Sequence, residues 1–194
     1  MLVLVRHGQS LYNQAGMFTG VVDAKLSVKG VEEAETTGRN LKEKGIRFDM
    51  AFSSHLSRAY DTASIILEET FSVCDIIEDK RLVERDYGNW SGTKKQELFL
   101  EHGEEMFKLY RRSWNTPPPG GESLKEVKER VERWIPQLKP FAKDNKNVLV
   151  SSHGNTMRAL SVAFGFHTEE SVVDYEVATG QPILLQWTSL EKHF

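Results

Sequence analysis

The chain has few of the features that mark several common classes of protein. Cys74 is its single cysteine among 194 residues, so no intramolecular disulfide can form, and a reducing compartment such as the cytoplasm is the expected location. Its 25 Lys and Arg residues do not exceed its 28 Asp and Glu residues, so the basic excess of a nucleic-acid-binding protein is absent. The apolar run at residues 1–5 stops at Arg6 and is too short for a signal peptide or a membrane span. We therefore expect neither nucleic acid nor a membrane as a partner.

Metal-binding patterns are also lacking. The six histidines are scattered, and none combines with the single cysteine at the spacing of a zinc site, so we expect no metal cofactor. What remains is an ordinary globular composition, with 39% hydrophobic and 27% charged residues. At roughly 100–200 residues per domain, residues 1–194 predict one domain.

The hydrophobic pattern alternates between short apolar runs and amphipathic segments. A continuous valine-rich run at the start is typical of a strand buried on both faces. Strands are expected at 2–5, 50–52, 76–77, 148–150 and 183–185, and helices at about 31–41, 56–67, 93–114, 123–138 and 156–164. The third helix is expected to break near Gly103, and Ser123 with Glu126 predicts a capping box at the start of the fourth. This alternation predicts an α/β fold with a largely parallel sheet.

Two histidines follow predicted buried strands directly, and each precedes a glycine. Ligands of parallel sheets bind beyond the carboxyl ends of the strands, where His7 and His153 would lie. By itself, a histidine such as His7 is a nucleophile, a base, a metal ligand or a buried structural residue. Arg6 favours a functional role, because a guanidinium binds phosphate or carboxylate oxygens through paired hydrogen bonds. We interpret Gly8 as a point where a ligand approaches the backbone.

Other charged residues add to this pattern. Arg58 lies near the start of a predicted helix, where anions are favoured, although an exposed helix arginine is the more common case. Glu84 lies in a charged loop. Histidines, arginines and one glutamate without a metal-ligand set favour phosphoryl transfer through histidine. In that chemistry a neutral imidazole attacks phosphorus, arginines bind its oxygens, and a carboxyl group transfers a proton.

The ordered set of these motifs resembles the histidine phosphatase superfamily over essentially the whole chain: Arg6-His7-Gly8, Arg58, Glu84 and His153-Gly154. The resemblance implies a three-layer α/β/α sandwich with a largely parallel sheet. It implies that His7 is the phosphorylated nucleophile and that Glu84 donates and accepts the proton. It also implies that the transferring phosphoryl group is bound by Arg6, Arg58 and His153.

Further stretches are similar to the cofactor-dependent phosphoglycerate mutase branch, namely 6–13, 18–27, 84–95, 111–112, 121–124 and 178–182. That branch interconverts 3-phosphoglycerate and 2-phosphoglycerate in glycolysis and gluconeogenesis, with 2,3-bisphosphoglycerate as the primer of the phosphohistidine and no metal. The substrate-binding residues that the similarity implies are Ser10, Asn13, Thr19, Gly20, Tyr87, Lys95, Arg111, Arg112, Gly154 and Asn155.

The charge of the substrate favours the same reaction. Phosphoglycerate carries a carboxylate besides its phosphate, and a mutase must hold a bisphosphorylated intermediate while it reorients. Cations beyond those on the transferring group are therefore needed, and Lys95, Arg111 and Arg112 are the candidates. The alternative is that Arg111 and Arg112 form a solvated pair on a helix surface.

Three features of the sequence favour a phosphatase as the alternative function. The segment between Arg112 and Gly121 is short for the mutase branch, which would admit water to the site and favour hydrolysis. The tail after Pro182 is also short, and residues 90–92 resemble a Trp-x-Gly ending seen in phosphatases. A non-catalytic phosphoester-binding domain is a third reading. The expected partner is a small phosphorylated substrate, and a homodimer is left open.

Overall fold

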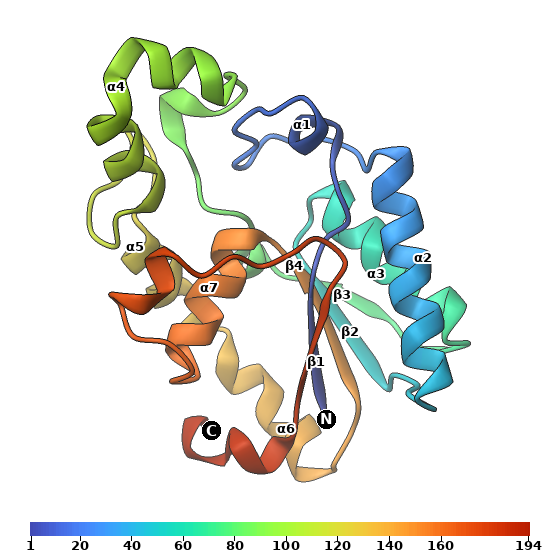
Figure 1. The fold of residues 1–194 in the computed structure, drawn as a ribbon. Helices are drawn as coiled ribbons and strands as arrows, with labels where there is room; N and C mark the ends of the chain where they lie inside the picture. The colour runs from blue at the N-terminus through green and yellow to red at the C-terminus, as the bar shows by residue number, and fades with distance from the viewer.

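A five-stranded sheet lies at the centre of the computed structural model, which describes residues 1–194 (Figure 1). The strand order is β3-β2-β4-β1-β5. β5 runs antiparallel to β1, and the other neighbours are parallel, which confirms the largely parallel sheet. The strands are β1 (Leu2–Arg6), β2 (Met50–Ser53), β3 (Ile76–Glu78), β4 (Val148–Ser152) and β5 (Pro182–Leu185).

The central strand β1 is apolar on both faces because both faces are covered. Leu2 and Leu4 belong to a cluster of 21 buried residues, whereas Val3 and Val5 belong to a separate cluster of 10. Successive side chains of a strand point to opposite faces, so the continuous apolar run supplies both clusters.

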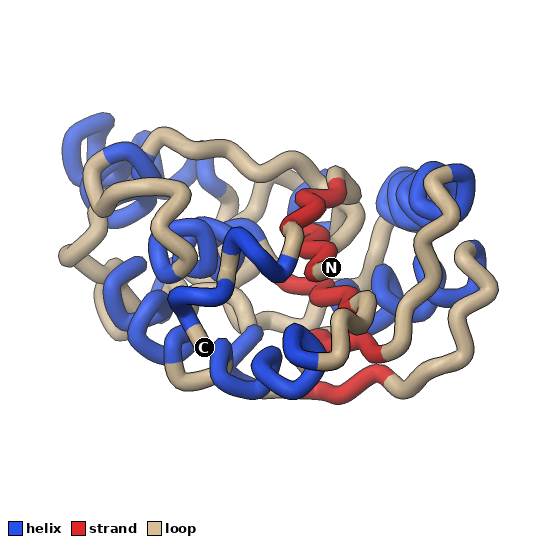
Figure 2. Tube along the Cα trace, turned by 90° about the horizontal axis from the view of Figure 1, so that it is seen from below, coloured by secondary structure: helices blue, strands red, loops and turns tan.

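Helices cover both faces, which confirms the three-layer arrangement (Figures 1 and 2). One layer holds α2 (Val28–Glu43) and α3 (Ser57–Glu69). The other layer holds α5 (Leu124–Glu132), α6 (Lys139–Lys143) and α7 (Gly154–Ala163). None of the helices is both long and apolar enough to cross a membrane.

The predicted helix at 123–138 is divided in the structure. α5 begins at the expected capping box of Ser123 and Glu126, in which each side chain binds the other residue's backbone N–H. The helix ends at Glu132 and is followed by a 3₁₀ turn and by α6, which carry Pro136 and Pro140. Each proline lies in the first turn of its element, where its missing N–H costs no hydrogen bond.

Helix α4 (Lys95–Arg112) stands beyond the carboxyl ends of the strands, near the short α1 (Leu11–Gln14) in Figure 1. As predicted, it is interrupted at Gly103, whose φ of 73° is in the left-handed region. A small apolar cluster supports its first turn, in which Leu98 packs with Phe18 and Trp90. This placement carries both ends of α4 towards the edge of the sheet at which His7 and His153 lie.

Candidate active site

The sheet topology brings the two histidines together. β1 and β4 are parallel neighbours in which Arg6 is paired with Ser152, so the next residues, His7 and His153, leave the sheet side by side. The backbone N–H of His7 continues the pairing by donating to the Ser152 carbonyl at 2.9 Å. The two ring centroids are 5.0 Å apart, and both side chains are buried.

His7 is held in the state that a nucleophile needs. Its Nδ1 lies 2.6 Å from the Gly8 carbonyl oxygen, which can only accept, so Nδ1 carries the proton and Nε2 presents a lone pair. Arg58 Nε donates to that Nε2 at 3.2 Å, which agrees with this tautomer. Burial, together with the charges of Arg58 and Arg6, lowers the pKa of His7 well below its usual value. The ring is therefore neutral at neutral pH.

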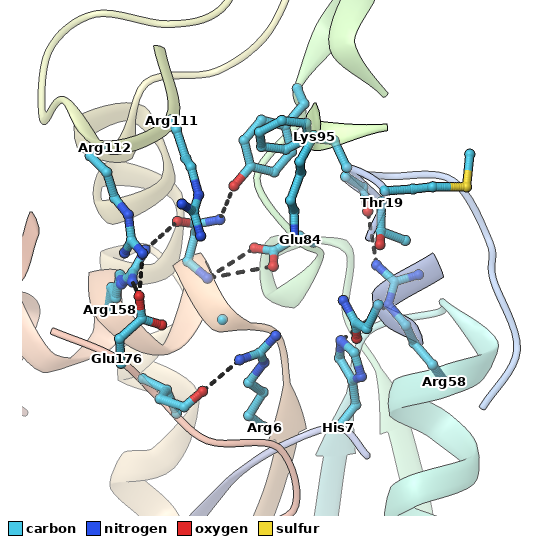
Figure 3. A pocket seen from close by; sticks show the side chains of 18 residues that line it. Arg6, His7, Thr19, Arg58, Glu84, Lys95, Arg111, Arg112, Arg158 and Glu176 are labelled. Atoms are coloured by element: carbon cyan, nitrogen blue, oxygen red, sulfur yellow. Dashed lines mark hydrogen bonds and ion pairs between the residues drawn. The ribbon is translucent and has the colours of Figure 1, made fainter. Parts of the chain in front are cut away.

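Arg58 is fully buried beside this ring at the start of α3. Its terminal nitrogens donate to the carbonyl oxygens of Val22 and Gly20, each at 2.8 Å. Burial lowers the pKa of Arg58 to about 10, which leaves the guanidinium charged at neutral pH. The alternative of an exposed helix arginine does not hold, because the side chain points inward at His7 (Figure 3).

His153 lies behind His7 and does not line the cavity. Its Nε2 is 2.7 Å from the Ser54 hydroxyl, and its Nδ1 is buried without a hydrogen-bond partner. Burial, then the charge of Arg58, lowers the pKa of His153 well below its usual value. Two neutral imidazoles therefore lie beside the buried Arg58 cation.

Arg6 and Gly154 form a cradle at the start of α7. Arg6 Nη1 donates to the Val177 carbonyl at 2.6 Å, whereas its Nε is buried without a partner. A Cβ on Gly154 would lie 3.4 Å from that Nε and 3.7 Å from an oxygen of Glu84. Thr19 Oγ1, on another wall of the cavity, is also buried without a partner. Hydrogen-bond donors without a partner around an open cradle are suited to bind the oxygens of a phosphoryl group.

Glu84 presents one carboxylate oxygen to this cradle and has the other one fixed. Its Oε1 accepts from the backbone N–H of Arg85 at 2.8 Å and of Asn155 at 3.1 Å. The side chain is largely buried, and its Oε2 lies on the side of Gly154. The carboxyl group is thus oriented by the backbone and open to a ligand on one side.

The opposite wall is made of cations from two helices. α4 contributes Lys95, Arg111 and Arg112, and α7 contributes Arg158 (Figure 3). Burial, then the neighbouring charge of Arg111, lowers the pKa of Lys95. The predicted residues that line the cavity together are Arg6, His7, Asn13, Thr19, Gly20, Arg58, Glu84, Tyr87, Lys95, Arg111, Arg112, Gly154 and Asn155.

Ser10 and Gly8 have roles other than those expected. Ser10 does not line the cavity; it is fully buried and caps α1, with its Oγ accepting from Asn13 N and its own N–H donating to Asn13 Oδ1, both at 3.1 Å. Ser10 therefore orients Asn13. A Cβ on Gly8 would lie 2.1 Å from the Gly30 carbonyl oxygen, so the glycine is required by close packing against α2 rather than by a ligand.

Sequence reasoning missed Arg158, Glu176 and Arg85. An arginine within the apolar stretch of α7 was the available signal for Arg158, whereas nothing in the sequence around Glu176 pointed to the site. Arg85 is buried and donates to the carbonyl oxygens of Glu122, Tyr110 and Arg111 at 2.6, 3.1 and 3.2 Å. It therefore ties the end of α4, and with it the cationic wall, to the loop that carries Glu84.

The comparison with known families agrees with this geometry. The sequence model of the histidine phosphatase superfamily (branch 1) matches residues 2–189. The chain belongs to the histidine phosphatase superfamily. No group of three or more His, Cys, Asp or Glu side chains in this member of the superfamily lies close enough together to hold a metal ion.

Two curated relatives at more than 40% identity carry the same name. A protein of Parvibaculum lavamentivorans, 43% identical over 96% of this chain and 90% of its own length, is named 2,3-bisphosphoglycerate-dependent phosphoglycerate mutase. A protein of Chelativorans sp. with the same name is 45% identical over 94% of this chain and 90% of its own length.

Two solved structures of similar fold are named as phosphatases. A mycobacterial glucosyl-3-phosphoglycerate phosphatase in complex with VO3 has a TM-score of 0.80 at 26% identity, covering 93% of this chain and 90% of its own. A putative alpha-ribazole-5'-P phosphatase from Escherichia coli has a TM-score of 0.77 at 27% identity, covering 93% and 87% of the two chains. The superfamily fold thus accommodates both reactions.

Proposed function

We propose that the protein is a 2,3-bisphosphoglycerate-dependent phosphoglycerate mutase, which interconverts 3-phosphoglycerate and 2-phosphoglycerate through a phosphohistidine at His7. The cavity itself carries the proposal, because a phosphoryl-transfer centre faces a second cationic group at Lys95, Arg111 and Arg112. The names of the relatives at 43–45% identity support it.

The transfer begins at His7. Its Nε2 lone pair attacks phosphorus while Nδ1–H stays bonded to the Gly8 carbonyl, so the positive charge that develops on the ring is stabilised by that hydrogen bond. Arg58 Nε, which donates to Nε2 in the structure, is then free to bind a phosphoryl oxygen. Arg6 Nε is a second donor at this position, and the cationic pair balances the charge on the oxygens in the transition state.

Glu84 transfers the proton of the reacting hydroxyl. Its Oε2 lies at the cradle, while two backbone N–H groups hold Oε1. As phosphorus leaves a substrate oxygen, Glu84 gives that oxygen a proton, and in the reverse step it takes the proton from the attacking hydroxyl. Proton transfer by a positioned group contributes typically about 10²–10⁴-fold in rate.

The mutase reaction adds a demand that hydrolysis does not make. Phospho-His7 transfers its phosphoryl group to the free hydroxyl of a bound monophosphoglycerate and takes one back from the other carbon, so the bound molecule must reorient without leaving. Lys95, Arg111 and Arg112 are placed to hold the anionic groups that are not reacting (Figure 3). When bound, 2,3-bisphosphoglycerate supplies the phosphoryl group that first charges His7, and Arg6, Arg58 and these three cations would hold it.

A phosphatase that uses the same phosphohistidine is the second candidate. The similarity to phosphatase structures favours it, and so does the short segment after Arg112. That segment packs against the Glu84 loop, where Asn89 N–H donates to the Pro119 carbonyl at 3.0 Å, and none of residues 113–121 lines the cavity. Water can therefore approach from a side that this segment leaves uncovered.

One assay separates the two candidates. The purified protein is incubated with 3-phosphoglycerate, with and without a trace of 2,3-bisphosphoglycerate, and 2-phosphoglycerate and free phosphate are followed in the same sample. The mutase proposal expects isomerisation that depends on the bisphosphate, with little phosphate released. Phosphate release without isomerisation would establish the phosphatase instead. If neither product forms, the mutase proposal is overturned.

A further inference from the structure

A carboxylate of the protein already binds the cationic wall. Glu176 forms ion pairs with Arg112 Nη2 and, at 3.5 Å, with Arg158 Nη2 (Figure 3). Burial alone would raise the pKa of Glu176, but the hydrogen bond and charge of Arg112 lower it below its usual value. Glu176 is therefore ionised at neutral pH, and it offsets part of the positive charge that faces the substrate.

The two arginines are held in place without Glu176. Arg158 Nε donates to the Tyr175 carbonyl at 2.6 Å, and its Nη1 donates to Asn155 Oδ1 at 3.2 Å. Arg112 Nη1 donates to the Val173 carbonyl at 3.4 Å. Their side chains are only 10% and 18% exposed. Both guanidinium groups therefore keep their places when the carboxylate between them is replaced.

The Glu176 side chain, by contrast, is free to move away from the two arginines. Its side chain is 65% exposed, and no other side chain than those of the two arginines binds it. It also borders a second, solvent-open hollow, which is lined by Lys108 and by the acidic residues Glu104 and Asp174. Displacement from Arg112 thus costs Glu176 little solvation, because its side chain already faces water.

We propose that Glu176 is a specificity-determining residue that occupies, in the ligand-free protein, the place on Arg112 and Arg158 taken by the non-reacting anionic group of the substrate. The proposal rests on the function proposed above. Glu176 is an internal competitor: a ligand with two anionic groups must displace it, whereas a ligand with one, seated at His7, leaves it in place. The residue therefore weakens the binding of doubly anionic substrates and products and speeds their release.

Ligand binding to a variant at this position tests the inference. Dissociation constants are measured by calorimetry on the unphosphorylated protein and on Glu176→Gln, with 3-phosphoglycerate and with glycerol 3-phosphate, which lacks the carboxylate; free phosphate is monitored to correct for hydrolysis. The variant is expected to bind 3-phosphoglycerate about three- to tenfold more tightly, with glycerol 3-phosphate unchanged within about twofold. Glu169→Gln is the matched control, because it removes one exposed carboxylate from the segment that precedes Glu176 and lines neither the catalytic cavity nor the second hollow, and it should change neither constant.

Other outcomes overturn the inference. Weaker or unchanged binding of 3-phosphoglycerate to Glu176→Gln would show that Glu176 supports the arginines instead of competing at them. Equal tightening for both ligands, or the same effect in Glu169→Gln, would show a general charge effect. Glu176→Ala serves as a second variant if the first is unstable. The proposed function fails separately, by lack of isomerisation in the unmodified protein, because the comparison of the two ligands does not depend on which reaction follows.

Discussion

The cavity has two walls that differ in construction. The inner wall, defined as Arg6, His7, Arg58 and Glu84, lies at the end of β1, at the start of α3 and in a buried loop, and backbone groups fix most of its polar atoms. The outer wall, defined as Lys95, Arg111, Arg112, Arg158 and Glu176, comes from α4, α7 and a surface segment, and its charges mainly face one another.

Under the proposed function, the two walls have different tasks. Phosphoryl transfer needs groups fixed in position before the substrate arrives, which the inner wall supplies. Substrate selection needs charge of the right amount in the right place, which the outer wall supplies. Such a division of tasks agrees with the similarity of this chain to mutases in sequence and to phosphatases in fold.

The largest effect is expected from removing the nucleophile of the inner wall. His7→Ala should lower the rates of isomerisation and of phosphate release by at least about 10⁴-fold, since no covalent intermediate can form. His55→Ala is the control, because His55 is exposed and does not line the cavity, and its rates should stay within about twofold. A His7→Ala enzyme that keeps either activity would place the nucleophile elsewhere. The His7→Ala variant is expected to keep its phosphoester binding. That result would not support a non-catalytic binding domain if the unmodified protein turns substrate over.

The next effect concerns proton transfer on the inner wall. Glu84→Gln keeps the shape and both backbone hydrogen bonds but cannot exchange a proton, so kcat should fall by about 10²–10⁴-fold with KM little changed. Steady-state kinetics with 3-phosphoglycerate measures both constants. Glu78→Gln, on the exposed end of β3, should leave them unchanged. A rise in KM with kcat preserved would make Glu84 a binding group.

A change in the outer wall should separate the two walls most clearly. Arg111→Gln removes a cation that faces the second anionic group, and a hydrogen bond between charged groups contributes about 1.5–3 kcal/mol. The KM for 3-phosphoglycerate should rise about 10–100-fold, with hydrolysis of a simple phosphomonoester changed less than about threefold. Arg39→Gln, an exposed helix arginine, is the control. Equal losses with both substrates would show that the walls do not act independently.

The smallest effect is on stability and follows from the two buried histidines, His7 of the inner wall and His153 behind it. His7 and His153 have pKa values below the ordinary 6.5, so below that pH the unfolded chain binds protons that the folded chain does not. The free energy of unfolding should therefore fall as pH drops from 6.5 to 5.5, by up to about 1.4 kcal/mol per pH unit for each histidine. Urea unfolding at the two pH values measures it, and His7→Ala should show the shallower dependence. An identical slope in that variant would mean that His7 titrates normally in the fold.

Part of the inner wall could be predicted from the sequence, because Arg6 and His7 lie at the end of a strand. Once 2–5 and 148–150 were read as buried parallel strands, the position of His7 and His153 at one sheet edge followed from the fold class. Arg58 needed the family resemblance, since an arginine at a helix start is otherwise unremarkable. The three-layer fold, the break at Gly103 and the capping box at Ser123 were also found.

The outer wall and the supporting contacts were harder to predict for physical reasons. Glu176 lies on an irregular segment without hydrophobic periodicity, so nothing local indicates what it faces. Gly8 was misinterpreted because the group that excludes a side chain there, the Gly30 carbonyl, belongs to a helix that follows a loop. Ser10 was expected in the cavity because its role as the cap of α1 depends on where that short helix begins.

The fate of a labelled phosphoryl group on His7 tests the central claim most directly. The protein is phosphorylated with isotopically labelled 2,3-bisphosphoglycerate, freed of excess ligand, and mixed with unlabelled 3-phosphoglycerate or with buffer alone. We predict that the label moves to phosphoglycerates much faster than it appears as free phosphate in buffer, because the outer wall holds the acceptor in place. Loss of label to free phosphate at the same rate with and without phosphoglycerate would contradict a mutase and leave a phosphatase.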